Sequence, residues 1–135
     1  KDLAYKLLKI GVLASAESDT HVQLATAQAL TADDLLLAIS FSGERREINL
    51  AAEVARQAGA KVLALTSFSP NGLQQRADHS LYTVAERPAT RGAAISASTA
   101  QYALTDLLFM ALIQHDADHA SSHIRHSEAL MKKLI

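Results

Sequence analysis

The amino-acid sequence predicts an α/β fold, a three-layer sandwich in which helices flank a parallel sheet. Short apolar segments rich in Leu, Val and Ile alternate along the chain with amphipathic segments of helical period. This alternation favours right-handed strand-helix-strand crossovers, which build a parallel sheet and cover its faces. A length of 135 residues is typical of one domain, so we expect a single domain over residues 1–135.

The composition indicates a globular protein without disulfides. Hydrophobic residues make up 49% of the chain and charged residues 20%, and no apolar run reaches the roughly 20 residues of a membrane span. The absence of cysteine excludes disulfides, thiolate metal ligands and a cysteine nucleophile. Together with the lack of a signal-like start, it favours a cytoplasmic protein. The formal charge of −1 provides no general basic surface, so contact with DNA would require another domain.

The elements of the first half follow from apolar spacing and from capping residues. A glycine after an apolar helical pattern is typical of a helix end, and Asp or Thr before one is typical of a helix start. The chain opens in a helical pattern without an initiator Met, so we expect a fragment of a longer protein in which the first strand of the fold is absent. The expected elements are a helix ended by Gly11, a helix capped by Asp19 or Thr20, a strand at Leu35–Ile39 and a helix at Glu44–Ala58.

The second half continues the alternation and ends in helices. Turn residues at Ser69–Gly72 separate a strand from a short helix, and Pro88–Gly92 is predicted to be a loop. The expected elements are a strand at Lys61–Thr66, a short helix at Leu73–Ala77, a strand at Ser80–Val84, a long Ala- and Leu-rich helix at Ser96–Gln114 and a polar-faced helix at Asp116–Ile135.

The segment Ser40-Phe41-Ser42-Gly43 connects a predicted strand to a predicted helix. In open parallel sheets, ligands bind beyond the carboxyl ends of the strands, which is where this segment lies. Two hydroxyls, a glycine that permits close backbone approach and the amides of a helix start together suit a phosphate. Spacing alone leaves open the alternative that the segment is a plain strand-to-helix turn. No nucleotide P-loop or Gly-x-Gly-x-x-Gly motif occurs.

Four motifs carry a resemblance to a known family. AISFSGERRE, KDLAYKLLKIG, ESDTHVQLATAQAL and STAQYALTDLLFMALIQ resemble the SIS (sugar isomerase) domain of RpiR-type bacterial transcription regulators, over essentially the whole chain. Among these, the chain is particularly similar to regulators that sense N-acetylmuramic acid 6-phosphate. The resemblance implies a phosphosugar effector, a homodimer or higher homo-oligomer, and DNA binding through a helix-turn-helix domain absent from the chain. It also implies control of carbohydrate or amino-sugar catabolism by ligand-dependent allostery.

The same resemblance implies the residues of the site. Arg45 stands where many SIS proteins have Thr, and its guanidinium either pairs with the phosphate or points to solvent. The family's first phosphate loop has no counterpart, because the chain begins after it. The expected phosphosugar-binding residues are Ser40, Phe41, Ser42, Gly43, Glu44, Arg45, Ser96 and Ser98.

A second function class remains open, because SIS folds also include phosphosugar isomerases and lyases. Glu44, Glu47 and Glu86 are the carboxylates near the predicted edge. Acidic residues at a helix start also simply complement the helix dipole, and the His-Gly-Asp cluster of phosphosugar isomerases is absent. We therefore expect no catalytic residue and no cofactor.

Two further patterns concern the last helices. His115, His119 and His123 repeat every four residues and His126 follows, so one helix would align them as metal-chelating pairs or as a polar contact face. We favour the contact face and expect no metal. The apolar segment Leu104–Ile113 exceeds what one face of a small sheet covers, which predicts a partner subunit.

Overall fold

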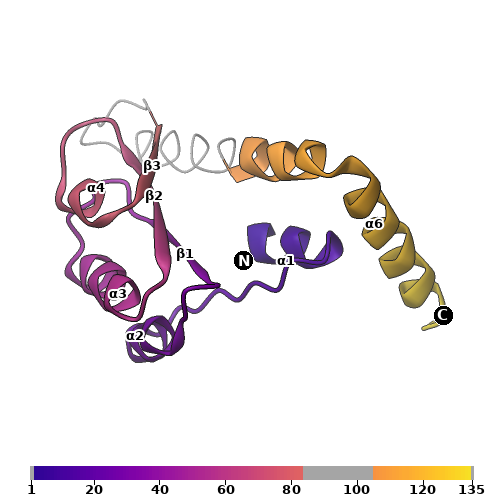
Figure 1. Cartoon of the computed structure of the whole chain (residues 1–135), viewed down its shortest axis with the longest axis horizontal. Coiled ribbons are helices and arrows are strands. Elements are labelled where there is room, and N and C mark those ends of the chain that lie inside the picture. The colour runs from indigo at the N-terminus through magenta and orange to yellow at the C-terminus, as the bar shows by residue number, and fades with distance from the viewer. Residues whose placement is uncertain (1, 84–104, 135) are drawn as a thin grey trace, which may run out of the picture. The chain divides into compact units, whose positions relative to one another are not determined.

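The computed structural model describes residues 2–83 and 105–134 (Figure 1). The chain divides into two compact units. The sheet unit comprises Glu17–Gln101, and the helical unit comprises Lys1–Ala16 with Tyr102–Ile135. We describe each unit by itself.

The sheet unit contains three parallel strands in the order β1-β2-β3, with two crossovers through helices. Leu35 pairs with Lys61, and Leu63 pairs with His79, so all three carboxyl ends lie at one edge of the sheet. The elements in chain order are α2 (Thr20–Ala29), β1 (Leu35–Ile39), α3 (Arg46–Gln57), β2 (Lys61–Ser67), α4 (Gly72–Arg76) and β3 (His79–Thr83).

The core of the sheet unit consists mainly of small side chains. Helices α2 and α3 and strands β1 and β2 each supply buried alanines. These small side chains allow α3 to approach the strands closely, and α2 packs against α3. Figure 1 shows α3 and α4 beside the strands, and both contact β2. The buried cluster is Ala27, Ala38, Ala51, Ala52, Ala55, Ala60, Val62, Ala64 and Leu73.

Capping residues explain where the helices of this unit begin. The Asp19 carboxylate accepts a hydrogen bond from the Val22 amide at 3.1 Å, so of the two predicted caps Asp19 is the one used. Helix α3 starts at Arg46, and the expected start at Glu44 is therefore wrong by two residues. Glu44 and Arg45 still belong to the preceding loop. Arg45 is the N-cap residue, with an extended ψ of 125°, and its side chain makes no capping hydrogen bond.

An aspartate joins the start of β3 to β2. The Asp78 carboxylate accepts a hydrogen bond from the Val62 amide at 2.7 Å, and its other oxygen lies 3.7 Å from the Arg56 guanidinium. The Val62 hydrogen bond is the main reason that the pKa of Asp78 lies below its usual value, and Arg56 adds to the effect. β3 begins at the next residue, His79, one residue earlier than predicted.

The helical unit contains α1 (Asp2–Lys9), a helix over residues 105–115 and α6 (Ala117–Lys132). Gly11 ends α1 with a φ of +83°, as predicted, and its amide donates to the Leu8 carbonyl. Lys6 Nζ contacts Asp106 Oδ1 at 2.7 Å, which joins α1 to the 105–115 helix. The predicted helix at Ser96–Gln114 is seen from residue 105 onward, and its first part lies outside the described residues. Within the described ranges, every helix lacks the length or the apolar character needed to cross a bilayer.

Candidate functional site

The loop between β1 and α3, residues 40–45, lies at the carboxyl edge of the sheet, as predicted. The Ser40 amide donates to the Leu65 carbonyl at 3.0 Å, and the Ser67 amide donates to the Phe41 carbonyl at 2.9 Å. These bonds extend the parallel ladder past the last residue of β1. The loop therefore leaves the sheet from a position fixed by β2.

Both serines of the loop stabilise its turns. The Ser40 hydroxyl oxygen accepts a hydrogen bond from the Gly43 amide at 3.2 Å, and the Ser42 hydroxyl oxygen accepts one from the Glu44 amide at 3.1 Å. Ser40 is buried and Ser42 is half-buried. A hydroxyl that accepts a hydrogen bond keeps its own hydrogen for donation, so both serines remain able to donate to an anion.

Glycine is required at position 43. Its φ is +69°, in the left-handed region where other L-residues are strained. A Cβ built at this position would overlap the carboxamide of Asn71 and would lie 2.7 Å from the Cβ of Asn71. The backbone therefore passes directly against the loop that follows β2.

Helix α3 begins directly after this loop, and an ion pair lies at its start. The first amides of a helix have no intrahelical partner and attract negative charge. Here Glu47 supplies such a charge: a hydrogen bond from its own backbone amide, and then one from Arg45, lower its pKa. Arg45 forms an ion pair with Glu47, and its side chain is 65% exposed. An incoming anion would compete with Glu47 for both groups.

The Glu44 carboxylate is used by the neighbouring loop. Its Oε1 accepts a hydrogen bond from the Gly72 amide at 2.8 Å, at the first residue of α4. Glu44 thus joins the loop after β1 to the loop after β2. Of the predicted site residues, the structure brings together residues 40–45, whereas Ser96, Ser98 and the alternative carboxylate Glu86 lie outside the described residues.

Sequence reasoning missed two asparagines that hold the loop. Asn49 Nδ2 donates to the Gly43 carbonyl at 3.0 Å and to the Arg45 carbonyl at 2.9 Å. The carboxamide of Asn71 lies against Gly43, as described above. The Asn71-Gly72 pair indicates a turn. Asn71 and Gly43 are 28 residues apart in the chain, and no local pattern predicts a contact between them.

One hydroxyl at the same edge of the sheet is unpaired. Thr83 ends β3 and pairs in register with Ser67. Its Oγ1 is buried and has no hydrogen-bond partner among the groups that the structure describes. A buried hydroxyl is costly when unpaired, so a polar ligand group at this edge would satisfy it.

The histidines of the helical unit pack among themselves and against a turn. The rings of His119 and His123 meet edge to face, with centroids 4.4 Å apart. The His123 ring lies so close to Gly11 that a Cβ there would come within 2.7 Å of Nε2. In the described ranges, no group of three or more His, Asp or Glu side chains is arranged to hold a metal ion. This statement covers all four histidines of the predicted pattern, from His115 to His126.

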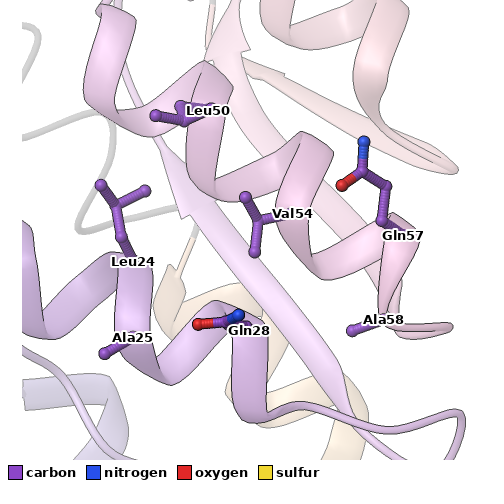
Figure 2. Close-up of a pocket in the computed structure, with 7 residues that line it drawn as sticks. All are labelled: Leu24, Ala25, Gln28, Leu50, Val54, Gln57 and Ala58. Carbon is purple, nitrogen blue, oxygen red and sulfur yellow. The ribbon is translucent and has the colours of Figure 1, made fainter.

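Figure 2 shows an open groove between α2 and α3. Leu24, Ala25 and Gln28 of α2 form one side, and Leu50 and Val54 of α3 form the other. None of the residues that line it belongs to the loop at 40–45, so the groove and the candidate anion site are separate.

Known proteins are similar to this chain in sequence. The family model described as SIS domain matches residues 1–111. The HTH-type transcriptional regulator YfhH of Escherichia coli (strain K12) is 60% identical over 135 residues, which are 100% of this chain and 48% of that protein.

Solved structures show the same fold. The Vibrio vulnificus NanR protein complexed with ManNAc-6P has a TM-score of 0.88 and 25% identity, over 99% of this chain and 50% of NanR. The sugar isomerase domain of the RpiR transcription factor from Sphaerobacter thermophilus has a TM-score of 0.70 and 20% identity, over 95% of this chain and 70% of that one. The chain thus spans about half the length of YfhH and NanR. These likenesses confirm the predicted three-layer α/β fold.

Proposed function

Because this chain belongs to the SIS domain family, we propose that it is the phosphosugar-sensing effector domain of a cytoplasmic, DNA-binding transcription regulator. The observation that carries the proposal is the loop at residues 40–45, which places two serine hydroxyls just before a helix start at the carboxyl edge of the sheet. The description of YfhH as an HTH-type transcriptional regulator and of NanR as complexed with ManNAc-6P supports this function class.

The effector we propose is a phosphorylated amino sugar, with N-acetylmuramic acid 6-phosphate as the leading candidate. Its phosphate would accept hydrogen bonds from the Ser40 and Ser42 hydroxyls and from the first amides of α3. Arg45 would exchange its contact with Glu47 for one with the phosphate.

The regulatory step is allosteric. A ligand shifts a conformational equilibrium only by its difference in affinity for the two states. The phosphosugar would favour one arrangement of the regulator and thereby change the position of DNA-binding domains that lie outside this chain. Expression of genes for carbohydrate or amino-sugar catabolism would follow the concentration of the effector.

The Ser40→Ala, Ser42→Ala double variant is expected to bind N-acetylmuramic acid 6-phosphate at least roughly a hundredfold more weakly than the parent. The variant loses two hydrogen bonds to a charged group, each of which contributes about 1.5–3 kcal/mol. Isothermal calorimetry against a panel of sugar phosphates and their unphosphorylated sugars measures the difference. The Ser121→Ala, Ser122→Ala variant on α6 is a matched control with the same chemical change.

Equal binding by the double variant and the parent would reduce Ser40–Gly43 to a structural turn and contradict the proposal. The rival function, a phosphosugar isomerase or lyase, is tested on the same protein by following the chemical fate of the sugar. Turnover would support the enzyme, whereas release of DNA from the full-length protein by the same compound supports the sensor.

The apolar surface of the helical unit is proposed to contact a second copy of the chain. Large apolar side chains are exposed along its helices, and a monomer rarely leaves so many uncovered. Their exposed fractions are 63% for Leu107, 56% for Met110, 61% for Leu130 and 55% for Met131.

The parent chain is expected to run as a dimer in size-exclusion chromatography with light scattering, and the Leu107→Glu, Met110→Glu variant as a monomer, because buried charges oppose association. The control Val22→Glu adds a charge at a position that is 43% exposed on α2, outside the helical unit, and should leave the dimer intact. A monomeric parent would refute the proposed contact.

A further inference from the structure

Asn71 is a buried side chain next to the candidate anion loop, with hydrogen bonds at both ends of its carboxamide. It is 5% exposed and comes just before α4. Its Oδ1 accepts a hydrogen bond from the Gln74 amide at 3.0 Å, and its Nδ2 donates to Thr66 Oγ1 at 3.2 Å and to the Ser69 carbonyl at 2.9 Å. Both ends of the carboxamide are therefore fixed.

This fixed carboxamide lies against Gly43 of the other loop. The space in which a Cβ of residue 43 would lie is filled by the Asn71 side chain. The amide of Leu73 also donates to the Gly43 carbonyl at 2.9 Å. The loop after β2 thus limits where the backbone of Gly43 can lie.

The position of Gly43 in turn determines the geometry of both serines. Its amide is the donor to the Ser40 hydroxyl, and the amide of the next residue, Glu44, is the donor to the Ser42 hydroxyl. A displacement of Gly43 would therefore disturb the hydrogen bonds that hold both hydroxyls. In the described residues no hydrogen bond joins Asn71 to Ser40 or Ser42, so its influence on them passes through Gly43.

We propose that Asn71 is a positioning residue for the phosphate of the effector, which holds Gly43 in the left-handed conformation that orients Ser40 and Ser42. The inference rests on the proposed function and adds to it a residue from outside the Ser-x-Ser-Gly motif. Its contribution is preorganisation: the loop is ordered before the ligand arrives, so binding does not have to order it.

Two substitutions separate this role from the capping of α4. Asn71→Ser keeps a good capping side chain but is too short to fill the space beside Gly43. Asn71→Asp keeps the shape of the side chain but cannot donate to Thr66 and Ser69, so one end of the side chain is no longer fixed. It also places a negative charge beside the phosphate. Asp19→Ser is the matched control, because it shortens the capping residue of a different helix, α2, whose cap bonds to Val22 and not to residues 40–45.

The test combines calorimetry of the full chain with N-acetylmuramic acid 6-phosphate and inorganic phosphate, and amide hydrogen exchange of the ligand-free chain. Asn71→Ser is expected to weaken binding of the phosphosugar by about tenfold and Asn71→Asp by more, while Asp19→Ser binds like the parent. In both Asn71 variants the amides of Gly43 and Glu44 should exchange faster, and those of β3 should not change.

The outcomes distinguish this inference from the proposed function. A parent that binds neither probe nor any sugar phosphate of the panel contradicts the proposed function, and with it the role of Asn71 in binding. A parent that binds, with Asn71 variants that bind equally well or show unchanged exchange at Gly43, overturns the role of Asn71 alone. Weakened binding together with faster exchange supports it.

Discussion

The Gly43→Ala variant is expected to be less stable than the parent by about 2–5 kcal/mol and to lose binding of the phosphosugar. A left-handed φ of +69° costs an alanine about 1–2 kcal/mol. The overlap of its Cβ with the buried Asn71 adds about 1–3 kcal/mol, as overpacking does. Relief of that overlap would move the loop and break the hydrogen bonds that hold the Ser40 and Ser42 hydroxyls.

Denaturant unfolding measures the change in stability, and calorimetry measures the loss of binding. Gly59→Ala is the matched control, since Gly59 has a φ of +98° but a Cβ there would lie no closer than 3.7 Å to any neighbour, the Ala32 amide nitrogen. It should show only the conformational cost and should bind the ligand normally. Equal destabilisation by the two variants would show that Asn71 does not constrain position 43.

The second large effect is expected for Leu73→Ala, which should destabilise the protein by about 2–5 kcal/mol. Leu73 is fully buried in the core of the sheet unit and is the buried residue of the short helix α4. Its loss would leave a cavity where the five residues of α4 are attached to the sheet. Because the Leu73 amide also bonds to Gly43, weaker phosphosugar binding should accompany the loss of stability.

Thermal or denaturant unfolding of Leu73→Ala beside Leu35→Ala provides the measurement. Leu35→Ala is the same chemical change at a position in β1 that is 58% exposed, so it should lower the free energy of unfolding by about 0.5 kcal/mol or less. Similar losses for the two variants would argue that α4 is not held by its leucine.

The sheet unit was largely predictable because its strands are short apolar runs bounded by turn residues. Leu35–Ile39 has the bounds expected from the sequence, and β2 is one residue longer than expected. The start of α3 was mispredicted because the charges of Glu44 and Arg45 suit a helix start as well as a loop. In the structure the Glu44 carboxylate accepts a hydrogen bond from the Gly72 amide, which is far away in the chain.

The candidate site was predictable only in its local part. The Ser-x-Ser-Gly pattern and the position after a strand indicated residues 40–43, and the resemblance to a family indicated a phosphosugar. The roles of Asn49 and Asn71 depend on how the chain folds in space. Asn49 bonds to the Gly43 carbonyl of the preceding loop, and Asn71 packs against Gly43 from the loop after β2. Periodicity and turn preferences describe neighbours in sequence and are silent on such contacts.

The order β1-β2-β3 leaves β1 at one edge of the described sheet. Its residues, Leu-Leu-Leu-Ala-Ile, carry no charge, and the strand contains neither proline nor a bulge. An uncharged apolar edge is a template for strand addition from another molecule, which leads to aggregation. The solubility of the sheet unit prepared in isolation would therefore depend on whether another segment covers this edge.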